Sequence, residues 1–185
     1  MNIAGTEKKL PPEKSVMEYG LLLLGTKAFS TALFRKKLLA KGYGKRETEE
    51  LITLLTERGY LNDLLYGESL CRSLRESARG TLWIRRKLHL AGLSRELTDR
   101  ILEEESRRGA VHSPFDLEEE SGEEEEQDVE LAAALKALRS KWRTLSRETD
   151  PGKKREKVLR FLAGRGFSSS SAYGALDKLL HSQEE

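Results

Sequence analysis

Three dense clusters of basic side chains are the residues of this chain best suited to binding a partner. Guanidinium and ammonium groups bind phosphates and carboxylates, and such binding weakens as the salt concentration rises. Each cluster is expected in the second helix of a three-helix segment. The candidate partner- or DNA-binding residues are Arg35, Lys36 and Lys37, then Arg85, Arg86 and Lys87, and finally Lys153, Lys154, Arg155, Lys157 and Arg160.

Two interpretations of these clusters are open. A charge run on one helix is usually a solvated face, and three consecutive residues spread over about 300° of a helix. Recurrence favours binding, because stacked helical segments would align the clusters into a stripe suited to phosphates or an acidic protein groove. Trp83 and Trp142 have the chemistry to stack on bases, but aromatic residues in helices more often belong to the core.

No residue pattern indicates catalysis, a cofactor or a metal site. The histidines His89, His112 and His181 are scattered, and neither paired cysteines nor an HExxH pattern accompanies them. Cys71 is the single cysteine and lies in a helical pattern without a nearby histidine, so we expect a buried thiol rather than a nucleophile. The chain has no GxxxxGK[ST] phosphate loop. We therefore expect a protein that is not an enzyme and needs no cofactor.

Three glycines that end helices set the positions of the clusters. Each stands between apolar residues that would touch across a Schellman cap. The sets are Leu38, Gly42 and Tyr43; Leu88, Gly92 and Leu93; and Leu162, Gly166 and Phe167. The first two glycines are 50 residues apart and the last two 74 apart, and the surplus of 24 falls at an acidic run. Gly59 and Gly109 each follow 17 residues after the first two, so we infer an internal repeat.

The repeat predicts an all-α protein, an elongated array of three tandem three-helix modules with an acidic disordered insert before the third. Each module is too short to bury a large core, so neighbouring modules are expected to stabilise one another. The predicted division is a flexible N-terminal tail at 1–14, modules at 15–61 and 62–109, an acidic linker at 110–128 and a third module at 129–185.

Helix starts are predicted by capping residues. Ser30 is a good N-cap, with Phe29 and Phe34 as a hydrophobic staple across it. Asn62 and Asp63 precede the first helix of the second module, and Asp150-Pro151 is an N-cap followed by proline at N1.

The net charge of +2 conceals a basic body with an acidic insert. Positions 116–128 hold nine acids and no base; without them 33 basic residues face 22 acidic ones, a net charge of +11. A basic body suggests a polyanionic partner, of which nucleic acid is the commonest. The acidic run itself is either a solubilising linker or a tethered competitor for the basic surface.

The remaining sequence features favour a cytoplasmic protein. A lone cysteine cannot form an internal disulfide, and the longest apolar run, Leu21–Leu24, is far shorter than a membrane span. The first residues lack the apolar core of a signal peptide.

Several of these segments, taken together in order and spacing, resemble the RecX family of regulators of the recombinase RecA. The opening module matches at Ser30 and at Lys37-Leu38 with Gly42. The segment Glu57–Asp63 (ERGYLND), followed by Tyr66 and Gly67, matches next, then the run from Gly80 through Ile84 and Leu88 to Gly92, and finally Phe161–Ser168 (FLAGRGFS). The resemblance covers residues 16–180 apart from the acidic insert.

The resemblance implies a protein that binds the RecA filament on single-stranded DNA, and we expect this protein to be a monomer. It implies that the protein modulates, mainly by inhibition, RecA's role in recombination, DNA repair and the SOS response, with no catalytic residue, cofactor or metal. The alternative is a general DNA-binding helical protein, transcriptional or architectural, because three-helix units can present a recognition helix to the major groove. Three basic helices in tandem favour a long, repetitive polymer as the partner.

Overall fold

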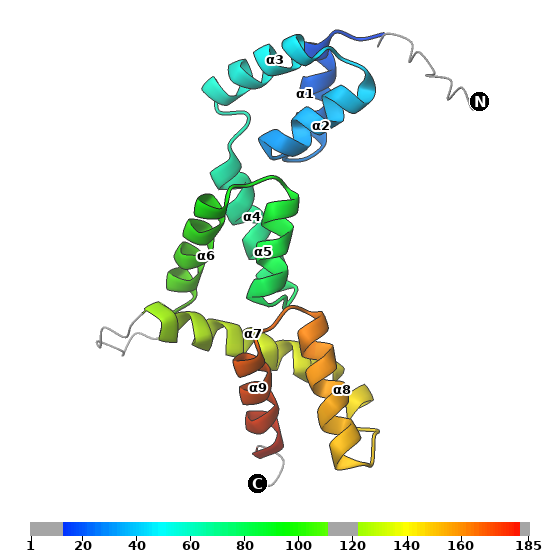
Figure 1. Ribbon diagram of the computed structural model, residues 1–185, viewed down its shortest axis with the longest axis vertical. Helices are drawn as coiled ribbons and strands as arrows, with labels where there is room; N and C mark the ends of the chain where they lie inside the picture. The colour runs from blue at the N-terminus through cyan, green and yellow to red at the C-terminus, as the bar shows by residue number, and fades with distance from the viewer. Residues whose placement is uncertain (1–12, 111–121, 182–185) are drawn as a thin grey trace, which may run out of the picture. The chain divides into compact units, whose positions relative to one another are not determined.

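All regular elements that the structure describes are α-helices. A computed structural model describes residues 13–110 and 122–181, and the residues outside these ranges include the predicted tail up to 12 and the linker stretch 111–121. The helices are α1 (Val16–Thr26), α2 (Thr31–Lys41), α3 (Lys45–Glu57), α4 (Asp63–Glu76), α5 (Thr81–Leu90), α6 (Arg95–Ala110), α7 (Gly122–Leu145), α8 (Pro151–Gly164) and α9 (Ser169–His181) (Figure 1). The predicted all-α class is confirmed for these ranges. No helix within them is long and apolar enough to cross a membrane.

The chain divides into two compact units. The first comprises Met1–Tyr66 with Ala91–Leu93, and the second comprises Gly67–Leu90 with Ser94–Glu185. Each predicted module corresponds to three helices, although α6 ends one residue after the second module and α7 begins before the third. The second and third predicted modules largely share the second unit. The division into three modules and the elongated arrangement therefore stay predictions.

The predicted caps are present at the helix starts. Ser30 accepts a hydrogen bond from the Leu33 N–H at 3.2 Å, and the Asn62 side chain accepts one from the Leu65 N–H at 3.1 Å. Asp150 accepts one from the Lys153 N–H at 3.0 Å. The rings of Phe29 and Phe34 meet edge to face, 6.2 Å apart, so the hydrophobic staple is confirmed.

The stop glycines, as we call Gly42, Gly92 and Gly166, all have left-handed backbones, with φ of 109°, 84° and 82°. After α2 the Tyr43 N–H donates to the Leu38 carbonyl at 3.3 Å, and after α8 the Phe167 N–H donates to the Leu162 carbonyl at 3.2 Å. These are the predicted Schellman bonds. Gly109, the repeat position equivalent to Gly59, lies inside α6, which runs on to Ala110.

Helix α7 begins earlier than predicted. We expected the linker to reach residue 128, but the helix starts at Gly122 and includes four consecutive glutamates in its first two turns. Glutamate is a good helix former, and its negative charge is favourable beside the unpaired N–H groups of a helix N-terminus. Like-charge repulsion is therefore offset at this end of the run.

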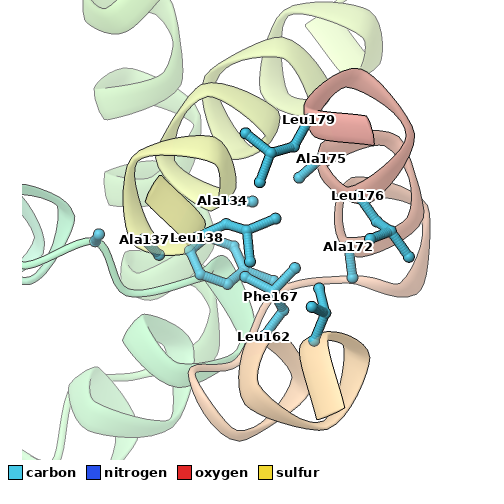
Figure 2. Close-up of a cluster of buried hydrophobic side chains, with 11 residues drawn as sticks. Ala134, Ala137, Leu138, Leu162, Phe167, Ala172, Ala175, Leu176 and Leu179 are labelled. Carbon is cyan, nitrogen blue, oxygen red and sulfur yellow. The ribbon is translucent and has the colours of Figure 1, made fainter. Parts of the chain in front are cut away.

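Each unit has its own apolar core. In the first unit Phe34 and Leu38 of α2 pack against Leu51, Ile52 and Leu55 of α3, with partly buried side chains of α1 around them. In the second unit side chains of α7, α8 and α9 point toward one another (Figure 2). Alanines such as Ala134 and Ala175, both fully buried, allow α7 and α9 to approach closely.

A repeated contact, which we call the glycine junction, places a stop glycine against the first turn of another helix. In the second unit the Gly80 N–H donates to the Arg165 carbonyl at 3.0 Å, and the Leu82 N–H donates to the Gly166 carbonyl at 3.1 Å. A Cβ atom on Gly166 would lie 2.4 Å from the backbone nitrogen of Trp83. Glycine is thus needed here for its backbone angles and for its size.

The first unit contains the same junction. Ser30, at the start of α2, donates its hydroxyl hydrogen to the Ala91 carbonyl. A Cβ atom on Gly92 would lie 2.3 Å from Cβ of Ala32 in the first turn of α2. Gly42, in contrast, has no such neighbour within 4 Å. The three stop glycines therefore share a conformation, but only Gly92 and Gly166 are also tightly packed.

This difference predicts unequal costs for alanine at the stop glycines. Gly42→Ala should cost about 1–2 kcal/mol, the strain of a left-handed alanine. Gly92→Ala and Gly166→Ala should each cost roughly 1–3 kcal/mol more, because the methyl group overpacks the junction. Urea denaturation of the three variants measures this order, and adding Ala32→Gly should restore part of the loss only in Gly92→Ala. Equal losses in all three variants would show that the junction has no energetic role.

Candidate partner-binding surfaces

The first basic cluster lies on α2, and its three members have different surroundings. The Arg35 guanidinium forms a two-pronged ion pair with Glu49 of α3, with N–O distances of 2.6 and 2.9 Å. Hydrogen bonding from Arg35 holds the pKa of Glu49 below its usual value. Lys36 and Lys37 are exposed. Arg35 thus joins α2 to α3, and the two lysines stay exposed on the surface.

The second cluster, on α5, repeats this pattern. Arg85 pairs with Asp99 of α6, which lowers the pKa of Asp99, as Arg35 pairs with Glu49 fifty residues earlier. Lys87 lies over the ring of Trp83, with 5.1 Å between its ammonium nitrogen and the ring centroid. Arg86 is exposed. In the first two sets of helices, the internal repeat therefore extends to an ion pair between the second and third helices.

The third cluster, on α8, does not lie at the equivalent place. Counted back from the stop glycines, the positions of Arg35 and Arg85 are taken by Leu159, which packs on the apolar core. Most of the basic residues of α8 lie one or two turns earlier. Lys157 pairs with Glu148, Arg160 pairs with Glu156, and the Arg155 guanidinium lies 5.3 Å from the ring centroid of Tyr173.

One basic position is common to all three clusters. Lys36, Arg86 and Arg160 each stand six residues before a stop glycine, and all three side chains are exposed. The clusters as a whole do not recur at equivalent positions, and only this one basic position is shared by all three. Lys36 belongs to the first unit, and Arg86 and Arg160 belong to the second.

The surroundings of Arg86 include apolar side chains that the sequence did not single out. Leu82 is 59% exposed and Leu90 is 64% exposed, one helical turn before and after Arg86. Residues four apart lie on one side of a helix, so α5 presents an apolar, basic, apolar strip. In the sequence, the signal for this strip was the helical spacing of Leu82 and Leu90, on the side of α5 opposite the buried Ile84 and Leu88.

The two tryptophans are partly buried rather than fully buried. Trp83 has the Arg79 guanidinium 4.9 Å from its ring centroid in addition to Lys87, so cations cover part of the ring. Trp142 packs against the core of α7, α8 and α9.

Cys71 is fully buried, as predicted. Burial raises the pKa of its thiol to about 11, so the thiol is protonated at neutral pH and is a poor nucleophile. Among the described residues no three His, Cys, Asp or Glu side chains come together as metal ligands.

The most constrained polar group of the second unit is the carboxylate of Glu130, which the sequence analysis missed. It is 5% exposed and accepts hydrogen bonds from the Thr81 N–H at 2.9 Å, from the Ser168 hydroxyl at 2.6 Å and from the Ser171 hydroxyl at 2.9 Å. Thr81 begins α5, and Ser168 is the residue before α9. One carboxylate of α7 thus satisfies groups at the N-termini of two other helices.

The pKa of Glu130 follows from a balance of two effects. Burial raises the pKa by disfavouring the charged form, but the hydrogen bonds from Ser168, Thr81 and Ser171 together lower it by more. The carboxylate is therefore ionised in the folded protein below its ordinary range. In the sequence, the available signal was the acidic residue between Val129 and Leu131, at the start of an otherwise apolar helical pattern.

Comparison with known proteins gives one consistent answer. Residues 128–176 match the profile described as RecX, third three-helix domain. "Regulatory protein RecX" of Neisseria meningitidis serogroup A is 25% identical over 167 residues, 90% of this chain and 92% of the relative. The protein of the same name from Deinococcus radiodurans is 28% identical over 163 residues, 88% of this chain and 67% of the relative.

Solved structures agree in fold. The crystal structure of RecX from Lactobacillus salivarius superposes with a TM-score of 0.67 at 16% identity, covering 89% of this chain and 94% of that one. A second crystal structure, of regulatory protein RecX, gives a TM-score of 0.67 at 20% identity, covering 88% of this chain and 70% of the other.

Together the glycine-ended helices and the repeated ion pairs define an all-helical protein built from repeated segments. Its relatives are regulatory proteins. Over most of its length the chain is similar to proteins named regulatory protein RecX, and residues 128–176 match the third three-helix domain of the RecX family.

The Glu130 network predicts a pH-dependent stability of the second unit. A carboxylate whose folded pKa is depressed stabilises the fold above its unfolded pKa, near 4.5, and this contribution disappears as pH falls through the folded value. Glu130→Gln should cost about 1.5–3 kcal/mol at neutral pH, the loss of charged hydrogen bonds. In melting curves from pH 7 to pH 3, the difference between parent and variant should shrink in acid.

The control for this measurement is Glu103→Gln, which removes an exposed carboxylate of α6. Its melting curves should follow those of the parent at every pH. A constant gap between the Glu130→Gln variant and the parent across the whole range would contradict the assigned role.

Proposed function

We propose that the protein binds the RecA filament on single-stranded DNA and restrains, mainly by inhibition, its recombinase activity, without catalysis of its own. The main support for this proposal is the similarity, over nine-tenths of the chain, to proteins named regulatory protein RecX. The proposal includes a monomeric state and a cytoplasmic location, as expected from the sequence.

The strip on α5 supports a protein as the main contact. Leu82 and Leu90 offer apolar area on either side of the Arg86 guanidinium. A phosphate backbone would use the guanidinium alone, whereas a protein groove that combines apolar residues with a carboxylate would use all three. Arginine is enriched at protein interfaces, and the buried centre of an interface is more apolar than the rest of the surface.

The contacts of the second cluster indicate which of its residues can be substituted without disturbing the fold. Arg85 is paired with Asp99, and the Lys87 ammonium lies over the Trp83 ring. Reversing Arg85, Arg86 and Lys87 together would therefore place a carboxylate against Asp99 and disturb the fold. Arg86 alone is the residue to change.

Arg86→Glu should weaken inhibition of RecA strand exchange and of its DNA-dependent ATPase roughly tenfold or more, a loss typical of a central interface arginine. Glutamate keeps the helix, because its helix propensity is close to that of arginine. The matched control is Arg100→Glu, which makes the same charge change at an exposed position of α6. Inhibition by Arg86→Glu equal to that by the parent would place the contact elsewhere.

A general DNA-binding role is the second candidate, since the shared position of Lys36, Arg86 and Arg160 is exposed and basic. The same variants discriminate between the two in a binding assay with DNA alone. Loss of DNA binding with inhibition intact would show that the regulator's contact is with protein. Loss of both in parallel would favour contact through phosphates.

A further inference from the structure

The first unit has a surface pocket lined by apolar residues, three lysines and a tyrosine. It has a volume of about 320 Å³ and is formed by the loop after α1, residues of α2 and Tyr66. All of these residues belong to the first unit. We call it the lysine-rimmed pocket.

The floor of the pocket is apolar and rigid. Phe29 is 6% exposed and its ring is held edge to face against Phe34 of the core. Leu33 and Ala40, seven residues apart on α2, lie along the same side of the helix and form a wall. The pocket is therefore part of the packed unit, and an apolar group that enters it would be removed from water at little cost in reordering.

The rim of the pocket carries three positive charges. Lys27, Lys36 and Lys37 line it, and none of the described residues lining it is acidic. The Lys27 ammonium lies 5.0 Å from the ring centroid of Phe29, so one of these charges is next to the apolar floor. Arg35, between Phe34 and Lys36, is engaged with Glu49 and does not contribute. The rim is thus a cationic collar around an apolar hollow.

Tyr66 adds a neutral polar group at the edge. Burial, and to a smaller extent Asp63, raises the pKa of its phenol, so the hydroxyl keeps its proton at neutral pH. A protonated phenol donates a hydrogen bond, and a carboxylate is a strong acceptor. The edge therefore favours the same sign of ligand charge as the rim.

We propose that the lysine-rimmed pocket binds an acidic peptide segment of a partner protein, with one large apolar side chain in the hollow and the neighbouring carboxylates on the three lysines. The volume suits a single phenylalanine or leucine side chain. The match is one of charge and shape together, because an apolar ligand alone would leave the lysines without a counter-charge. The inference goes beyond the proposed function, since it concerns a separate surface and does not depend on which protein is regulated.

A nucleic acid fits the pocket less well. Binding of single strands relies on open aromatic faces for stacking and on a long basic groove. Here Phe29 is buried beneath a lysine, Tyr66 is only partly exposed, and the lysines surround one short hollow. The observations therefore favour a peptide.

The test is fluorescence anisotropy with the full chain and a fluorescein-labelled peptide in which one phenylalanine is flanked on both sides by aspartates. We expect saturable binding that weakens at least tenfold, or 1.4 kcal/mol, when alanine replaces the phenylalanine. Lys37→Glu should weaken binding at least tenfold. Ala40→Trp, which fills the hollow from an exposed position without changing charge, should do the same.

The matched control is Lys45→Glu, an equal charge change at an exposed position at the start of α3, outside the pocket. It should alter affinity less than twofold, and circular dichroism melting should show that all the variants fold. Absence of saturable binding, or an equal loss in Lys45→Glu, would overturn the proposal. So would binding of an unlabelled thymidine oligonucleotide at the pocket, sensitive to Lys37→Glu, without binding of the peptide.

Discussion

One buried carboxylate organises the second unit. Glu130 of α7 is removed from water, and its charge is stabilised only because the amide of Thr81 and the hydroxyls of Ser168 and Ser171 converge on it. Those groups lie at the N-termini of α5 and α9, where unpaired amides favour negative charge. If any of the three helices moved, a buried charge and helix-end donors would lose their partners together, so the network fixes α5, α7 and α9 in one arrangement.

The first unit uses the same device with a shorter side chain. Asp63, at the start of α4, accepts a hydrogen bond from the Thr31 N–H at 2.7 Å. Thr31 and Thr81 are fifty residues apart and each is the first residue of its helix, α2 or α5. In both units an acid from a later helix binds the first amide of an earlier one, and a stop glycine packs beside it. Charge and close packing thus act at the same place.

The sequence was sufficient where a rule depends on neighbours along the chain. The stop glycines, the N-caps at Ser30 and Asp150 and the Phe29–Phe34 staple are local, and so could be predicted. The roles of Glu130 and of the pairs Arg35–Glu49 and Arg85–Asp99 depend on side chains brought together by folding. For the same reason, a basic triplet looked uniform in sequence although its members are held differently in the fold.

The internal ion pairs also bear on how the protein would respond to salt. Of the eleven basic candidates, Arg35, Arg85, Lys157 and Arg160 already have carboxylate partners on their own unit, and Lys87 and Arg155 lie over aromatic rings. The affinity of a polyanion falls with salt according to the number of condensed counterions that the protein displaces. Cations already paired within the fold displace few, so the count of released ions would fall below the formal charge of the basic body.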